Sequence, residues 1–248
     1  MKPYAMIPIM ECGEPLVPIP SDVFSLVSPH PYMKLQAPYG DRSPFFVRTS
    51  VLELLTKAQT YLQQKQPGWQ ICIFDAYRPI AVQKFMVEYT FAELLQRRNL
   101  KIDNLSQRQR QTLWQEVYQF WARPSDDPAT PPPHSTGAAI DVTLTDEQGN
   151  PIDMGSPIDE LSSRSFPDYF APTSLHIQDW TVSQENAEVF HQRRLLLHRV
   201  MAKVGFRRHP QEWWHFSWGD QLWAWIMNRE RMETMLVARY GAIMGARN

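Results

Sequence analysis

The sequence predicts an α+β fold in which helices flank a central antiparallel sheet. Helical patterns come mostly before strand patterns, and one further helix is expected between a hairpin and the last strand. Turn-forming residues between two extended segments, at 146–150, indicate that hairpin. Because strands and helices do not alternate regularly, an antiparallel sheet is favoured over a doubly wound parallel one.

The composition indicates one domain. Of the 248 residues, 43% are hydrophobic, which is enough for one continuous core, so residues 1–248 are expected to form a single domain. Residues 1–47 carry many prolines and little periodicity, and we expect them to form an irregular N-terminal arm. Aromatic side chains in this arm indicate that it packs on the core: Phe24, Tyr32, Tyr39, Phe45 and Phe46.

The first half of the chain contains three predicted helices and one predicted strand. Apolar residues recur at three- and four-residue steps over 50–64, which predicts a helix with Ser50 as its N-cap. Pro67 and Gly68 end this helix, and the apolar run at 69–74 predicts a buried strand. Similar helical spacing predicts two further helices, at residues 80–97 and 106–121.

The second half begins after a proline-rich surface connection at 123–133. Ser183 is expected to cap a helix that runs to about Val204 and is closed by Gly205. The extended segments expected are a strand at 138–145 that turns into 151–155, and a last strand at 212–218. A C-terminal helix is expected at 221–241.

Charge and cysteine content disfavour several classes of protein. Lys and Arg total 25 against 26 Asp and Glu, a net charge of −1, so neither nucleic acid nor a membrane is an expected partner. Two cysteines make no disulfide framework, and Cys72 lies in an apolar run typical of a core. No signal peptide is visible in the first 20 residues, and no apolar run reaches the ~18 residues of a spanning helix. We therefore expect a soluble, cytoplasmic protein.

The stretch PPPHSTGAAID, at 131–141, contains two candidate metal ligands. His134 and Asp141 offer an imidazole nitrogen and a carboxylate oxygen, which are both good zinc ligands. Gly137 and Ala139 leave space on the strand face that carries Asp141. The alternative for this pair is a surface histidine after a proline loop and a strand aspartate in a turn. The alternative for the small residues is that another strand packs closely on them. Catalytic zinc usually takes three protein ligands, so a third is needed.

The sequence Glu212-Trp213-Trp214-His215 offers that ligand. His215 could bind the metal, and Glu212 could act as a general base beside it. Positions three apart in a regular strand face opposite sides, so Glu212 must lie in the turn before the strand or at a bulge. The alternative is an aromatic core strand whose Glu212 and His215 face solvent.

Arg78, at the exit of the strand predicted at 69–74, could stabilise negative charge on a tetrahedral intermediate because its own charge is permanent. A structural ion pair with Asp75, three residues earlier, is the alternative. Four other histidines have no partner at ligand spacing and are expected mostly at the surface: His176, His191, His198 and His209. Motifs of zincins, nucleotide-binding loops and serine hydrolases are absent from the sequence.

Three motifs together resemble the zinc D-alanyl-D-alanine dipeptidases of the vancomycin-resistance type. They are HxxGxAxD at 134–141, ExWH at 212–215 and DAYRP at 75–79, and their order and separations fit that family over roughly residues 50–226. The family belongs to a D,D-peptidase superfamily whose fold is shared with the signalling domain of hedgehog proteins. The resemblance implies a hedgehog-like α+β fold and hydrolysis of D-alanyl-D-alanine to two D-alanine molecules.

The resemblance also implies roles for individual residues. One zinc ion per chain would have three ligands, His134, Asp141 and His215. Glu212 would be the general acid and base for attack by a zinc-activated water, and Arg78 would polarise the scissile carbonyl. Asp153 resembles the family's acidic residue near the free amine of the substrate. The family usually has serine two residues before its first ligand, whereas Pro132 stands here, which bears on substrate preference more than on the zinc site.

Two alternatives remain open on the sequence. A D,D-carboxypeptidase or peptidoglycan endopeptidase would have the same zinc site but cut N-acylated substrates. A non-catalytic, zinc-stabilised binding module would use the metal for structure alone, although the presence of Glu212 and Arg78 speaks against it. The expected partner is a small dipeptide, and the sequence indicates neither the oligomeric state nor whether the activity serves resistance, D-alanine recycling or wall turnover.

Overall fold

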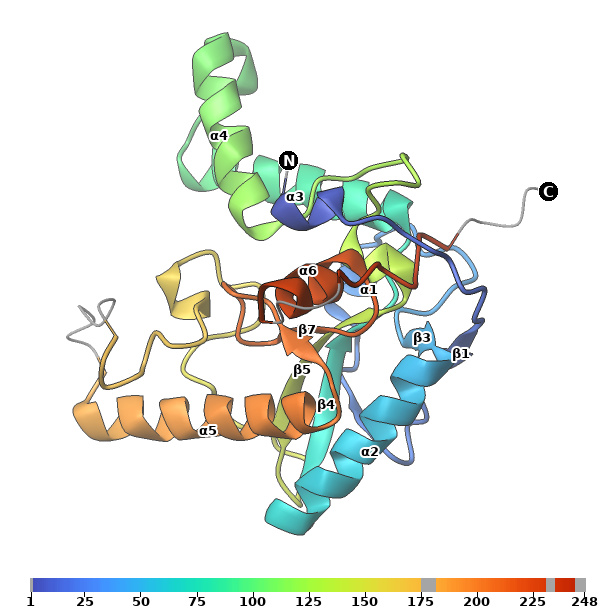
Figure 1. Ribbon diagram of the computed structural model, residues 1–248. Coiled ribbons are helices and arrows are strands. Elements are labelled where there is room, and N and C mark those ends of the chain that lie inside the picture. The colour runs from blue at the N-terminus through green and yellow to red at the C-terminus, as the bar shows by residue number, and fades with distance from the viewer. Residues whose placement is uncertain (1, 175–181, 231–234, 244–248) are drawn as a thin grey trace.

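The computed structural model describes residues 2–174, 182–230 and 235–243 (Figure 1). Its α-helices are α1 (Pro31–Lys34), α2 (Thr49–Lys65), α3 (Ile80–Arg97), α4 (Gln107–Phe120), α5 (Gln184–Lys203) and α6 (Gln221–Glu230). Its strands are β1 (Leu16–Pro18), β2 (Ser25–Leu26), β3 (Phe46–Arg48), β4 (Gln70–Asp75), β5 (Ala139–Thr145), β6 (Arg207–Arg208) and β7 (His215–Ser217). Two short 3-10 helices matter for the site, η1 (Pro3–Met6) and η3 (Pro133–Thr136). Among the described helices, none combines the length and apolar character needed to cross a membrane.

The central sheet has five strands in the order β2-β4-β5-β7-β6. The pairs β4–β5, β5–β7 and β7–β6 are antiparallel, but β2 runs parallel to β4, so the sheet is mixed and the prediction of an antiparallel sheet is wrong at this edge. β2 is only two residues long and lies in the proline-rich segment 1–47, where no alternating pattern marks a strand. A separate two-stranded sheet pairs β1 with β3.

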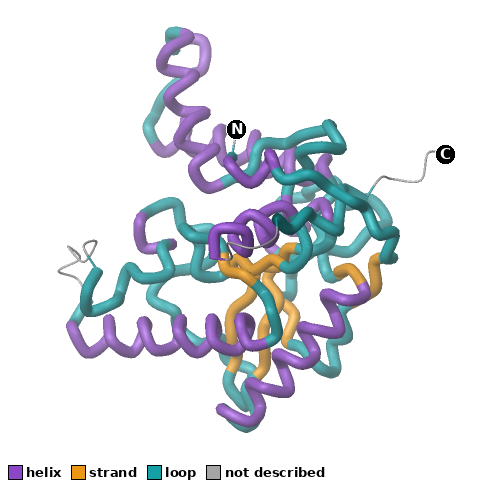
Figure 2. The backbone as a smooth tube through the Cα atoms, viewed as in Figure 1, coloured by secondary structure: helices purple, strands orange, loops and turns teal. Residues whose placement is uncertain are grey.

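One face of the central sheet is covered by α2 and α5. α2 contacts both β4 and α5, and Figure 2 shows these two helices beside the strands. The largest core cluster lies here, and within it Ile140, Val142 and Leu144 of β5 are fully buried. Because successive side chains of a strand point to opposite faces, Asp141 projects away from this core. The opposite face is therefore available for polar chemistry.

A second cluster joins α3 and α4 to the N-terminal arm. Phe91 of α3 and Trp114 of α4 stack with their ring centroids 4.0 Å apart. Tyr32 and Tyr39, from the segment 1–47, are buried in this same cluster, and Phe24 is buried in the main core. This packing brings the C-terminal end of α4 close to the free face of the sheet.

Most of the predicted elements form where they were expected. α2, α3, α4, α5, β4 and β5 each begin and end within one residue of the predicted ranges. The Ser183 side chain caps α5 by accepting a hydrogen bond from the backbone N–H of Asn186, at 3.2 Å. The predicted hairpin is reduced to one bridge between Thr145 and Pro151. Cys72 is buried and unpaired, as predicted.

The N-cap predicted for α2 is wrong. The helix begins at Thr49, so Ser50 lies inside its first turn. The carboxylate of Glu14 accepts hydrogen bonds from the backbone N–H of Ser50 at 3.0 Å and from its Oγ at 2.8 Å. A residue from the arm thus satisfies this helix terminus, and local sequence carries no sign of such a distant partner.

The C-terminal helix is shorter than the predicted 221–241. α6 ends at Glu230, residues 231–234 lie outside the described part of the chain, and residues 235–241 are not helical. The Asn228 side chain accepts from the backbone N–H of Leu236 at 2.7 Å and donates to its carbonyl at 2.9 Å. Ala238 then pairs with Ile9 of the arm. These tertiary hydrogen bonds outweigh the helical pattern.

Candidate active site

Three polar side chains lie in a row across neighbouring strands. Asp75 at the end of β4 pairs with Asp141 on β5, and Asp141 pairs with His215 at the start of β7. Directly opposed residues on antiparallel strands project to the same face of the sheet. The register of β4 shifts between Ile73 and Asp75, and this bulge places Asp75 opposite Asp141.

His134 reaches this row from η3, which immediately precedes β5. Pro133 occupies the first turn of η3, where a missing backbone N–H costs no hydrogen bond. Gly137 ends η3 with φ of +71°, and a Cβ at this position would lie only 2.3 Å from Cδ2 of Leu16. The proline and the glycine therefore set the backbone path that carries His134 back toward the strand.

His134, Asp141 and His215 form a cluster that could hold a metal ion. All three are buried, and one ligand atom from each lies within 4.8 Å of the others. Nε2 of His134 lies 3.2 Å from Oδ2 of Asp141, and Nδ1 of His215 lies 3.0 Å from Oδ1 of the same carboxylate. These two ring nitrogens are 3.2 Å apart.

The surroundings of the cluster suit metal binding. Nδ1 of His134 lies 2.8 Å from the carbonyl oxygen of Ala76, which can only accept, so Nδ1 donates and leaves the Nε2 lone pair facing the cluster. Burial raises the pKa of Asp141, but His134 and His215 together lower it further than burial raises it, which keeps the carboxylate ionised. Two imidazoles and one carboxylate match a donor set of catalytic zinc.

Glu212 lies in the turn between β6 and β7, beside the cluster and outside it. The predicted strand is shorter than expected because β7 begins only at His215, and this start lets Glu212 face the site. Its Oε2 lies 3.7 Å from Nδ1 of His215, and its Oε1 lies 3.7 Å from Nδ1 of His209. Burial raises the pKa of Glu212 well above its usual value, and the charges of Asp141 and Asp159 add to the shift. A carboxyl group in this environment can both accept and donate a proton.

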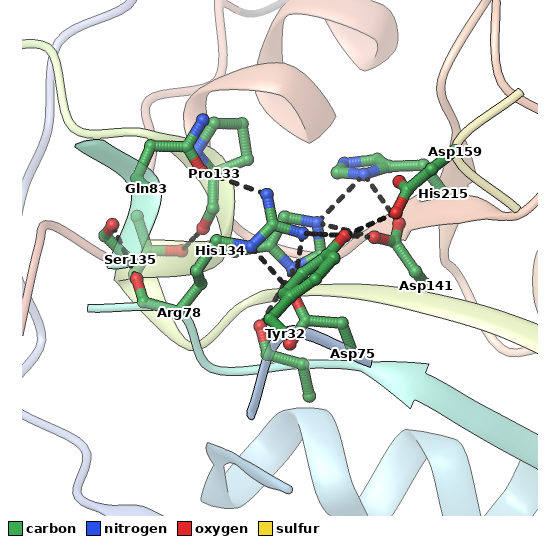
Figure 3. A network of polar contacts seen from close by, with 12 residues as sticks. Tyr32, Asp75, Arg78, Gln83, Pro133, His134, Ser135, Asp141, Asp159 and His215 are labelled. Atoms are coloured by element: carbon green, nitrogen blue, oxygen red, sulfur yellow. Dashed lines mark hydrogen bonds and ion pairs between the residues drawn. The ribbon is translucent and has the colours of Figure 1, made fainter. Parts of the chain in front are cut away.

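Arg78 forms the structural ion pair considered above and also faces the cluster (Figure 3). Its Nη2 lies 2.7 Å from Oδ2 of Asp75 and 3.5 Å from Oδ2 of Asp141. Nη1 donates to the Gln83 side chain at 2.9 Å, and Nη2 donates to the Tyr32 hydroxyl at 3.3 Å. The guanidinium is therefore fixed in place, with its permanent charge at the edge of the cluster.

One pocket is lined by all five of these residues, namely Arg78, His134, Asp141, Glu212 and His215. Its other walls come from distant parts of the chain. The N-terminal segment contributes Lys2 and Tyr4, the end of α4 contributes Trp121, and the β6–β7 turn contributes His209. The candidate metal cluster and the candidate acid–base group thus share one pocket.

Asp153 is not brought to this pocket. It is exposed, its Oδ1 accepts a hydrogen bond from the backbone N–H of Gly155 at 2.8 Å, and it borders a different hollow. Asp159, six residues later, lines the pocket and accepts a hydrogen bond from the Tyr32 hydroxyl at 2.7 Å. Burial raises the pKa of Asp159 to about 6, and the charge of Asp141 contributes to the shift. Both carboxylates lie in one irregular segment, so no periodic pattern distinguishes them.

Two histidines near the site were not predicted to lie there. His209 was expected at the surface, but its ring centroid lies 5.6 Å from that of His215 and it lines the pocket. His30 is buried, with Nε2 3.2 Å from Oδ1 of Asp75. Neither histidine has a partner at ligand spacing along the chain, so the sequence does not mark them. The β6–β7 hairpin carries His209 to the site, and the arm carries His30 there. His176 lies outside the described residues.

Comparison with known proteins extends the similarity beyond the three motifs. A family model described as D-ala-D-ala dipeptidase, peptidase M15, matches residues 26–235. The chain is 48% identical over 243 residues to a D-alanyl-D-alanine dipeptidase of Synechocystis sp., covering 98% of this chain and 97% of the relative. It is 40% identical over 84 residues to a D-alanyl-D-alanine dipeptidase of Escherichia coli (strain K12), covering 34% of this chain and 36% of that relative. The protein therefore belongs to the D-Ala-D-Ala dipeptidase family of metallopeptidases.

Proposed function

We propose that this peptidase hydrolyses D-alanyl-D-alanine to two D-alanine molecules, with one zinc ion bound by His134, Asp141 and His215. The observation that carries the proposal is that these three side chains share a pocket with Glu212 and Arg78. The Synechocystis relative, which is named for this dipeptide and matches almost the whole chain, supports the choice of substrate.

Glu212 would carry the proton through the reaction. Bound zinc would supply a Lewis acid that polarises the carbonyl and lowers the pKa of water. Glu212 would accept the proton that the attacking water loses, since its carboxylate lies beside the cluster without belonging to it. It would then donate this proton to the nitrogen of the leaving D-alanine as the C–N bond breaks. The Glu212 carboxylate is thereby restored, and the proton taken from water has passed to the leaving amine.

Arg78 would stabilise the negative charge that develops on the carbonyl oxygen. A cation that is already held in position needs no reorganisation when charge develops beside it. The ion pair with Asp75 and the hydrogen bond to Gln83 hold the guanidinium in this way. The ion pair that seemed to argue against a catalytic Arg78 is thus compatible with that role.

Asp159 would bind the free amine of the dipeptide, in place of Asp153. Its carboxylate lines the pocket, and with a pKa of about 6 it is mostly ionised at neutral pH. The Tyr32 hydroxyl holds one oxygen at 2.7 Å. A half-buried carboxylate with an ammonium partner favours substrates whose amine is unblocked, because a neutral group would leave the carboxylate unpaired.

Release of D-alanine by the zinc-loaded protein tests the proposal. We expect cleavage of D-alanyl-D-alanine, and cleavage of its N-acetylated form to be roughly 100-fold slower or more, because acetylation removes the ammonium that Asp159 would bind. Similar rates on both compounds would favour a D,D-carboxypeptidase or endopeptidase. Cleavage of neither would favour a zinc-stabilised binding module.

Replacing Asp159 by asparagine is expected to lower kcat/KM for D-alanyl-D-alanine by about 10–100-fold, the range expected for a hydrogen bond to a charged group. The variant should also discriminate less between the free and the acetylated dipeptide, which the same assay measures. Asp153→Asn is the matched control, since this carboxylate lies outside the pocket. Equal losses in both variants would contradict the assignment of the amine to Asp159.

A further inference from the structure

The N-terminal segment 2–7 forms one wall of the candidate active site. η1 packs against α6, and Figure 1 shows this dark-blue turn between α6 and the pair α3 and α4. The buried side chain of Gln221 donates from Nε2 to the carbonyl of Ile7 at 2.6 Å and to that of Ala129 at 2.9 Å. Ile9, just beyond, pairs with Ala238. The segment is therefore fastened to α6 and to the C-terminal part of the chain, which fixes its position over the pocket.

Lys2 brings a positive charge to this wall. It lines the pocket, and its Nζ donates to the carbonyl of Gln119 near the end of α4 at 3.3 Å. Within the described residues, no carboxylate forms an ion pair with Lys2. The guanidinium of Arg78, by contrast, is already engaged by Asp75. An ammonium has three donors, so Lys2 keeps donors free for a ligand.

The reaction geometry determines which end of the substrate would face Lys2. Glu212 would donate its proton to the nitrogen of the C-terminal residue, and a single carbon separates that nitrogen from the terminal carboxylate. The carboxylate must therefore lie on the Glu212 side of the pocket.

Lys2 lines the same pocket as Glu212 and His209, and Nδ1 of His209 lies 3.7 Å from Oε1 of Glu212. Burial lowers the pKa of Lys2, and the charge of Glu212 opposes this shift. The ammonium therefore acts on the Glu212 side of the pocket.

We propose that Lys2 binds the C-terminal carboxylate of the dipeptide, an inference that rests on the proposed function. Asp159 and Lys2 would then hold the two oppositely charged ends of one small zwitterion, with the scissile bond between them. Pro132 borders the adjoining hollow together with Lys2 and has neither a hydroxyl nor a backbone N–H, so it offers the carboxylate no hydrogen bond. A substrate extended beyond this carboxylate would lose the ion pair.

The test compares Lys2→Met with the wild-type protein, both zinc-loaded, on D-alanyl-D-alanine and on its C-terminal amide. For the dipeptide we expect KM to rise about 10–100-fold, as for the loss of a charge-assisted hydrogen bond, with kcat changed less than about threefold. For the amide, which has no carboxylate, the kinetic constants of the two proteins should agree within about twofold. Lys2→Arg should retain much of the wild-type KM, and Lys57→Met, an exposed lysine of α2, is the matched control.

Equal losses on the dipeptide and the amide, or no loss on either, would overturn the proposal. If the wild-type protein cleaves neither compound, the proposed function fails, and calorimetric titration of D-alanine into both proteins then decides the role of Lys2 separately. Weaker binding of D-alanine by Lys2→Met than by wild type would support a carboxylate contact. Equal binding by the two proteins, or none by either, would refute it.

Discussion

Replacing Glu212 by glutamine is expected to lower kcat for D-alanyl-D-alanine by about 10³-fold, within the range typical of general acid–base groups, while zinc stays bound. An amide of the same size cannot accept the proton of the attacking water or return it to the leaving amine. The three candidate ligands are untouched, because Glu212 lies 3.7 Å from the nearest ligand nitrogen and outside the cluster. An assay of D-alanine release measures the loss of activity, and mass spectrometry measures whether zinc stays bound.

The fold of this variant should be unaffected. Burial raises the pKa of Glu212 well above its usual value, so a neutral side chain is tolerated at this position, and glutamine reproduces the shape of the protonated acid. We expect the melting temperatures of the metal-free variant and wild type to agree within a few degrees. Glu53→Gln, on the exposed side of α2, is the control for a lost carboxylate elsewhere. An active Glu212→Gln protein, or one that loses its zinc, would contradict the assigned role.

The residues proposed for zinc binding could be predicted from the sequence because each motif is a short segment with its own local geometry. A turn that requires Gly137 joins His134 to the strand that carries Asp141. Glu212 and His215 are similarly joined by one turn, and its position was predictable because side chains three apart cannot face the same side of a regular strand. Local rules therefore identified the candidate site.

The residues that form the walls of the pocket could not be predicted in this way. Asp159 sits in an irregular segment that the Tyr32 hydroxyl holds from the N-terminal arm. The position of Lys2 depends on the hydrogen bond by which Gln221, more than 200 positions away, anchors the N-terminal segment. Such contacts join segments far apart in the chain, and no spacing rule links their members. Asp159 lines the pocket and Asp153, the residue suggested by resemblance, borders a different hollow, and only the folded chain separates the two carboxylates in this way.

The helices and strands likewise divide into those that local sequence predicts and those that depend on distant parts of the chain. The amphipathic pattern over 50–64 predicted α2 within one residue, because one face of that helix is buried along its whole length. The cap of that helix by Glu14, and the parallel edge strand β2, both come from the arm 1–47. A two-residue strand has no period to detect, and its direction is set by the strand on which it lies.

Replacing His215 by alanine is expected to weaken zinc binding by on the order of 100-fold or more, because outer-shell partners alone are worth about 10–100-fold. Only His134 and Asp141 would remain, and two protein ligands are fewer than catalytic zinc usually takes. Activity should fall with zinc content, and competition with a chromophoric chelator measures the affinity. His198→Ala, a histidine of α5 that is outside the cluster, should bind zinc as wild type does.

Stability gives a second readout of the same change that does not depend on activity. A ligand that binds only the folded state stabilises it by RT ln(1 + [L]/Kd), so a 100-fold weaker Kd at fixed excess zinc removes about 2.7 kcal/mol of that stabilisation. Zinc should therefore raise the melting temperature of wild type and of Glu212→Gln alike, but raise that of His215→Ala much less. If His215→Ala kept the full zinc-dependent shift, His215 would not be a ligand. If wild type showed no shift, the cluster itself would not be a zinc site, whatever its similarity to one.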